Sequence, residues 1–124
     1  MENCFCGNNQ PFSACCESFL LKKSKPSTAE QLMRSRYTAY VVKAIDYLMD
    51  TTHPSQRKYY SKNALLKWAN QCQWKRLQIL MSTVNEVAFS AVYADSKGNL
   101  HEHREWSTFI FENGSWYYLE GKDY

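Results

Sequence analysis

The segment from residue 27 to residue 54 limits the possible folds of this sequence more than any other part. Its apolar residues recur at helical spacing over several turns, which predicts one long helical segment that can bend near residues 43–46. Ser27 and Glu30 have the spacing of a capping box, and Pro54 ends the segment because proline excludes helical geometry from the residue before it. The C-terminal part of the chain alternates like strands, so we expect a curved sheet that covers the apolar side of this helical segment.

Length, charge and hydropathy limit the classes of protein to which this chain can belong. A chain of 124 residues with 44% apolar residues is long enough for one domain with a hydrophobic core and too short for two. The net charge of +3 is too small to predict nucleic-acid binding. No apolar run approaches the roughly 18 residues of a membrane span, and the N-terminus lacks a signal-peptide pattern. We therefore expect a cytoplasmic protein that binds neither nucleic acid nor a membrane.

Four of the five cysteines form a cluster near the N-terminus, with the pattern C-x-C, eight residues, C-C. The residues between the pairs are rich in Gly, Asn and Pro, which form the turn that a meeting of the two pairs requires. In a reducing compartment, clustered thiols are more often metal ligands than disulfides, and zinc prefers four such ligands. Disulfides, free thiols and an iron–sulfur cluster stay open as alternatives. The predicted zinc ligands are Cys4, Cys6, Cys15 and Cys16.

This cysteine pattern, with Gly7 directly after the second cysteine, is similar to the SEC-C motif. That motif is the zinc-binding knuckle at the C-terminus of the SecA translocation ATPase, and it occurs on many otherwise unrelated proteins. The resemblance implies that zinc is the cofactor and that the same cysteines are its ligands. It also implies that the knuckle has a structural or protein-docking role, with a chaperone or the translation and export machinery as the class of partner.

Two further segments resemble the YchJ-like family of small bacterial proteins. The first is LMRSRY, followed by DYL and THP, and the second is EWSTF, followed by NGSWYYLEG. The resemblance covers nearly the whole chain and implies a cystatin-like α+β cone, the fold of nuclear transport factor 2, in which helices pack in a curved antiparallel sheet. We accordingly expect a knuckle with its linker at residues 1–25 and a cystatin-like domain at residues 26–124. Because such folds often dimerise, a homodimer through the sheet is a further expectation.

Two features lie between the helical segment and the sheet. Ser61 is placed to cap another helix, whose inner face is expected to carry Ala64, Leu65 and Trp68. Cys72 stands alone in the sequence, and we interpret it as a small buried apolar residue rather than a nucleophile.

Asn113-Gly114 predicts a two-residue β-hairpin, because both residues tolerate the positive φ of a type I′ turn. Counting outward from this turn pairs Phe111 with Trp116 and Phe109 with Tyr118 on one face of the sheet. The aromatic residues of that face give way to polar residues toward the start of the first strand. The polar residues are Ser107, Glu105, His103 and His101.

This face supports two interpretations. In the simpler one, the aromatic residues are core and the polar residues are exposed. In the other, the cone holds a small ligand, and Glu105 with His103 or His53 acts as an acid or base, a role known from ketosteroid isomerase on this kind of scaffold. No catalytic set is recognisable, so enzymatic activity is left open, and a zinc-binding docking protein is the preferred hypothesis. The candidate pocket residues are Glu105, His103, His53, Tyr37, Tyr40, Trp68 and Tyr118.

Overall fold

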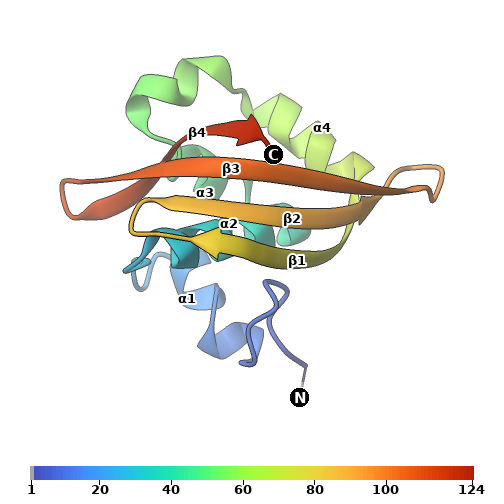
Figure 1. Cartoon of the computed structure of the whole chain (residues 1–124), viewed down its shortest axis with the longest axis horizontal. Coiled ribbons are helices and arrows are strands. Elements are labelled where there is room, and N and C mark those ends of the chain that lie inside the picture. Colours follow the sequence, from blue (N-terminus) through green and yellow to red (C-terminus); the bar gives the residue numbers. More distant parts are fainter. Residues whose placement is uncertain (1) are drawn as a thin grey trace.

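A computed structural model, which describes residues 2–124, has the expected α+β architecture (Figure 1). Four antiparallel strands form one sheet in chain order, and helices α2 and α3 lie behind it in this view. The N-terminal segment lies beyond the β1 edge of the sheet. The elements are η1 (Phe12–Ala14), α1 (Glu17–Leu20), α2 (Ala29–Val42), α3 (Ile45–Asp50), η2 (Pro54–Tyr59), α4 (Lys62–Gln71), β1 (Gln73–Ser82), β2 (Glu86–Ala94), β3 (Leu100–Glu112) and β4 (Ser115–Asp123).

The helical segment starts one residue later than the capping box predicted. Thr28 is the N-cap, and its side-chain oxygen accepts a hydrogen bond of 3.1 Å from the backbone N–H of Gln31. The Gln31 amide oxygen in turn accepts a 2.9 Å hydrogen bond from the backbone N–H of Ser27. Gln31 therefore bonds both residues that precede the helix, in the role predicted for Glu30, and Glu30 instead accepts a hydrogen bond from Arg34 on the next turn.

The predicted single helical segment is two helices. Lys43 has a left-handed backbone with φ of 63°, so α2 ends there and α3 starts at Ile45 in a new direction. The second helix ends at Asp50, before the predicted stop, and Pro54 opens the 3-10 helix η2 instead. Within residues 2–124, no helix combines the length and hydropathy that crossing a bilayer requires.

Helix α4 begins as predicted, because the Ser61 hydroxyl accepts a 3.0 Å hydrogen bond from the backbone N–H of Ala64. Its inner face is only partly the predicted one. Ala64 is exposed and Leu65 is half-buried, whereas Ala69 is fully buried. Trp68 is partly exposed but packs edge-on against Trp74 of β1 and Tyr93 of β2, so its indole connects this helix to the sheet.

The Asn113-Gly114 hairpin has the predicted register, with Phe111 opposite Trp116 and Phe109 opposite Tyr118. The prediction that all these aromatic residues are core was wrong at the tip. Phe109 is 2% exposed, whereas Phe111 is 57% exposed. Figure 1 shows the reason, because the β3–β4 hairpin projects beyond the helices that cover the rest of the sheet.

The main core joins the sheet, helix α2 and the N-terminal cysteines. Cys4, Cys6 and Cys16 are buried in the same cluster as Leu32 and Phe109. The cysteine segment therefore packs onto the domain and does not hang from it as a separate unit. Cys72 is buried and lies outside this cluster, as the sequence predicted.

Candidate metal centre and cone pocket

The four N-terminal cysteines converge on one point. Their sulfur atoms all lie within 4.8 Å of one another, and the Sγ atoms of Cys6 and Cys15 are 3.7 Å apart. Those of Cys15 and Cys16 are 3.9 Å apart. A zinc ion with Zn–S bonds of about 2.3 Å requires tetrahedron edges of roughly 3.8 Å, whereas a disulfide requires sulfurs about 2.0 Å apart. The thiols are free, and their arrangement fits four-coordinate binding of a metal ion.

A tight turn brings the two cysteine pairs together. The backbone N–H of Gly7 donates to the carbonyl of Cys4 at 3.0 Å, and Gly7 has a φ of +93°, which other residues rarely adopt. The N–H of Cys4 donates to the carbonyl of Gln10 at 2.6 Å, which closes the loop before η1. Gly7 is therefore required by the backbone geometry of the turn between the pairs.

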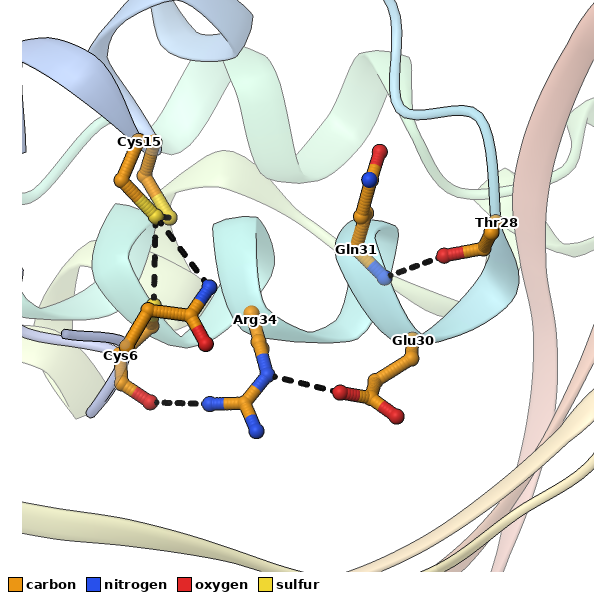
Figure 2. Close-up of polar contacts among 8 residues, drawn as sticks. Cys6, Cys15, Thr28, Glu30, Gln31 and Arg34 are labelled. Carbon is orange, nitrogen blue, oxygen red and sulfur yellow. Dashed lines mark hydrogen bonds and ion pairs between the residues drawn. The ribbon is translucent and has the colours of Figure 1, made fainter. Parts of the chain in front are cut away.

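Residues around the cysteines orient them and offer hydrogen bonds to sulfur. The side-chain amide of Asn8 donates to Cys15 Sγ at 3.5 Å, and the buried Thr38 hydroxyl lies 4.0 Å from Cys4 Sγ. Arg34 of α2 donates to the Cys6 carbonyl at 2.7 Å and to Glu30 at 3.0 Å, and Figure 2 shows its guanidinium between these two partners. Such contacts outside the ligand set fix ligand orientation and stabilise thiolates.

The cluster favours negative charge on one sulfur. A hydrogen bond from the Cys16 thiol lowers the pKa of Cys6 to about 5, against an opposing effect of burial. The same hydrogen bond raises the pKa of Cys16, and burial raises the pKa of Cys15. A bound cation is what would let the remaining thiols lose their protons.

A second site lies between the helices and the concave face of the sheet. It is a cavity of about 270 Å³, somewhat below the size typical of drug-sized ligand sites. Six of the seven predicted pocket residues line it, and His53 does not. The lining residues are Met33, Arg36, Tyr37, Tyr40, Tyr60, Trp68, Trp74, Phe89, Ala91, His103, Glu105 and Tyr118.

Glu105 is the acidic group of this cavity, and its carboxylate is fully engaged. One oxygen accepts hydrogen bonds from Ser107 at 2.6 Å and from Tyr118 at 3.0 Å, and the other lies 3.1 Å from His103 Nε2. Gly121 of β4 makes room for it, since a Cβ there would lie 2.1 Å from the same carboxylate oxygen. Burial raises the pKa of Glu105, but the hydrogen bonds from His103, Ser107 and Tyr118 outweigh it, and the net pKa is lowered.

The hydrogen bond to Glu105 also raises the pKa of His103. We therefore expect this pair to contribute to the free energy of unfolding in a pH-dependent way. The Glu105 part is present above its ordinary pKa of 4.5 and is lost as pH falls through the lowered folded value. The His103 part is present below its ordinary pKa of 6.5 and is lost as pH rises through the raised folded value. The stabilisation should therefore be greatest between these two ordinary values.

Urea unfolding of the natural protein and of His103→Gln across this pH range measures that contribution. Because His103 is partly exposed, we expect a difference of up to about 1 kcal/mol, largest in the window and smaller on either side. His101→Gln is the comparison for a more exposed histidine–carboxylate pair, since His101 pairs with Asp95 outside the cavity and its loss should give a smaller pH-dependent difference. A difference for His103→Gln that is constant with pH would contradict the pairing.

The other two histidines lie away from Glu105. His53 Nε2 is 2.6 Å from Glu112 and its Nδ1 is 2.7 Å from Ser55, so it holds the hairpin end of β3 against the start of η2. His101 stacks on Tyr93 and lies 2.8 Å from Asp95. The sequence placed His53 near Glu105 only by analogy, and the structure gives it a different carboxylate.

Sequence reasoning missed Arg36, which lines the cavity from α2 and is only 7% exposed. A signal was present, because Leu32, Arg36 and Tyr40 recur at four-residue spacing on one helix face. A charged residue in the middle of an apolar face indicates a specific role.

Comparison with known proteins identifies the family of the chain. The family described as "YchJ, middle NTF2-like domain" matches residues 28–121. A UPF0225 protein of Haemophilus influenzae (strain 86-028NP) is 40% identical over 97% of this chain and 77% of its own length. A UPF0225 protein of Geobacter sulfurreducens is 38% identical over 95% of this chain and 77% of its own length.

Two solved structures of SEC-C motif containing proteins have a similar fold. The solution structure from Rhodopseudomonas palustris aligns with a TM-score of 0.91 at 31% identity and covers 99% of each chain. The crystal structure from Psychrobacter arcticus has a TM-score of 0.77 at 24% identity, covers 97% of this chain and 81% of that one, and supports the fold alone. These matches confirm the resemblances and the fold expected from the sequence: the chain belongs to the YchJ-like UPF0225 family, and its main domain is NTF2-like.

Proposed function

We propose that Cys4, Cys6, Cys15 and Cys16 bind one zinc ion, and that the resulting knuckle is a structural and protein-docking module beside the NTF2-like domain of a cytoplasmic protein. The observation that carries this proposal is the spacing of the sulfurs, with separations of 3.7 and 3.9 Å that match the edges of a zinc tetrathiolate. The SEC-C description of the Rhodopseudomonas palustris protein is consistent with it.

Metal type and geometry are tested with cobalt(II), which takes tetrahedral thiolate sites and, unlike zinc, absorbs visible light. Metal-free protein titrated with cobalt(II) should develop the intense bands of a tetrahedral tetrathiolate at one equivalent. Zinc should then remove those bands, because zinc binds such sites more tightly than cobalt does. Weak octahedral bands, or cobalt bands that excess zinc leaves in place, would contradict a zinc tetrathiolate.

The docking role is supported by Phe5, which lies between two of the ligands and is 48% exposed. It packs edge-on against Phe12, with ring centroids 5.6 Å apart, so the metal loop presents an ordered aromatic surface. Exposed aromatic residues on rigid supports are frequent anchors of protein interfaces.

Docking is tested by placing a photo-crosslinking amino acid at position 5 in cells. We expect a protein adduct that forms with the natural cysteines and disappears when Cys6 is replaced by serine. The same crosslinker at the exposed position of Phe111 is the control for nonspecific capture. An adduct that survives loss of Cys6, or that also forms at position 111, would argue against docking through the knuckle.

A second proposed function, binding of a small molecule in the cone, is supported by the cavity between α2, α4 and the sheet. Its chemistry favours binding over proton transfer by Glu105. A general base works best when its pKa is near the working pH, whereas three hydrogen-bond donors lower the pKa of this carboxylate. Glu105 is therefore proposed as a polar contact for a ligand or for its supporting residues.

A further inference from the structure

Arg36 is a buried cation with no carboxylate partner. The residue is 7% exposed, and among residues 2–124 its guanidinium forms no ion pair. A buried charge without a counter-ion is costly, so its retention calls for an explanation.

The hydrogen bonds of Arg36 use only one side of the guanidinium. Nη1 donates to the Leu48 carbonyl at 3.0 Å and to the Thr51 hydroxyl at 2.8 Å, which ties α2 to the end of α3. Within the described chain, Nε and Nη2 have no hydrogen-bond partner. This edge is the one that binds the two oxygens of a carboxylate in parallel.

The free edge of Arg36 meets the cavity. Among residues 2–124, Trp74 Nε1 is the side-chain nitrogen or oxygen that is both fully buried and without a hydrogen-bond partner. The unpartnered Nε and Nη2 of Arg36 do not meet this description, so they are not fully enclosed by protein. Arg36 lines the cavity, and this is the space that its free nitrogens can reach. An anion entering it would supply the missing partner.

Glu105 does not serve as the counter-ion of Arg36, although both line the cavity. The Arg36 guanidinium lies over the Tyr118 ring, 4.5 Å from its centroid, and the hydroxyl of that ring donates to Glu105. The carboxylate is already bonded by Ser107, Tyr118 and His103. The site thus contains one acidic group whose hydrogen bonds are already filled and one cation without a carboxylate partner, which suits a ligand with a single negative charge.

The residues that line the cavity indicate the shape and polarity of the part of the ligand beyond its charged group. Aromatic side chains from two helices and three strands surround the cavity, and its volume of about 270 Å³ admits a small ring system. Tyr60 and Trp68 are each 38% exposed and lie at the solvent side, while Arg36 and Tyr118 are buried. A flat apolar body with a carboxylate at its inner end matches this gradient.

On the basis of the proposed ligand-binding role of the cone, we propose that its ligand is a small aromatic or otherwise apolar monocarboxylate, and that the Nε–Nη2 edge of Arg36 recognises the carboxylate. The Tyr118 ring stacks against the guanidinium and stabilises its charge. Glu105, which also lines the cavity, disfavours ligands with more negative charge. Arg36 is then both a tie between two helices and the specificity residue of the pocket.

The test compares three probes that share one ring system, namely 1-naphthylacetate, 1-naphthylacetamide and 2-(1-naphthyl)ethylamine. Binding is measured from shifts of backbone and side-chain NMR signals of the intact protein. We expect the carboxylate to bind about tenfold to a hundredfold more tightly than the amide, the range of a charge-assisted hydrogen-bonded pair, and more tightly than the amine. The Arg36 Nε–H signal should move with the carboxylate and stay in place with the amide.

Arg36→Lys should lower the affinity ratio of carboxylate to amide severalfold, since lysine keeps the positive charge but lacks the bidentate edge. Arg57→Lys is the matched control, because Arg57 also donates to backbone carbonyls of residues 50 and 52 but does not line the cavity. The shift of the Arg36 signal in the natural protein decides the question if Arg36→Lys does not fold.

Two negative results have different meanings. Equal binding of acid and amide, or an unmoved Arg36 signal, would overturn carboxylate recognition while the cone remained a ligand site. Failure of all three probes to shift any signal from the cavity would overturn the ligand-binding role of the cone, and this inference with it.

Discussion

Replacement of Cys6 by serine is expected to abolish metal binding and to lower the free energy of unfolding by several kcal/mol, because structural zinc sites contribute about 10 kcal/mol or more when intact. Cys6 is fully buried, its sulfur lies 3.7 Å from that of Cys15, and a serine hydroxyl is a poor substitute for a thiolate ligand. The sheet and α2 should still fold. Metal content by elemental analysis and urea unfolding measure the two effects.

Cys72→Ser is the matched control for this change. Cys72 is also a buried free thiol, but it lies between α4 and β1 and outside the four-cysteine cluster. We expect it to keep a full equivalent of metal and to lose stability only through the buried hydroxyl, by about 1–3 kcal/mol. A full metal equivalent on Cys6→Ser would show that the cluster is not the binding site.

Phe109→Ala is expected to destabilise the protein by about 3–5 kcal/mol, the range for truncation of a large buried aromatic residue. Phe109 is 2% exposed and packs edge-on against Tyr118, with ring centroids 5.8 Å apart. It also belongs to the cluster that includes Cys6 and Leu32, so the cavity left behind would lie at the centre of the domain.

The same change two residues away provides the comparison. Phe111 is on the same strand and the same face, but it is 57% exposed at the hairpin tip. We expect Phe111→Ala to cost less than about 1 kcal/mol, as for most surface substitutions. Equal losses for the two variants in urea unfolding would contradict the placement of the core boundary between them.

Features fixed by neighbouring residues could be predicted from the sequence. The Asn113-Gly114 turn determined the hairpin register, and Ser61 marked the start of α4. The spacing of the cysteines predicted their convergence, because a short turn leaves few other arrangements. In each case the deciding interactions lie within one loop or one helical turn.

Features that depend on packing could not be predicted. The sequence predicted a bend near residues 43–46, but the left-handed backbone at Lys43 that separates two helices there costs energy for a lysine and is not marked by the residues beside it. The exposure of Phe111 depends on how far the helices extend along the sheet. His53 meets Glu112 across 59 residues of chain, and its partner was therefore not visible in the sequence.

The cone pocket falls between these cases. The alternation of β3 and the register of the β3–β4 hairpin placed Glu105, His103 and Tyr118 on one face, and the structure brings them into one hydrogen-bonded group. Arg36 joins them only because the break after α2 turns α3 back, so that the Leu48 carbonyl meets the guanidinium. The place of the Arg36 guanidinium in the pocket therefore depends on the tertiary structure.

Native mass spectrometry of the freshly purified protein, before and after a chelator, tests the central claim most directly. We predict a mass increment of one zinc ion on a chain with four thiol protons removed, and its loss on chelation with the protons restored. A chain that carries no metal and lacks four hydrogens would instead contain two disulfides. That result would contradict both the metal centre and the reducing compartment that we propose for this protein.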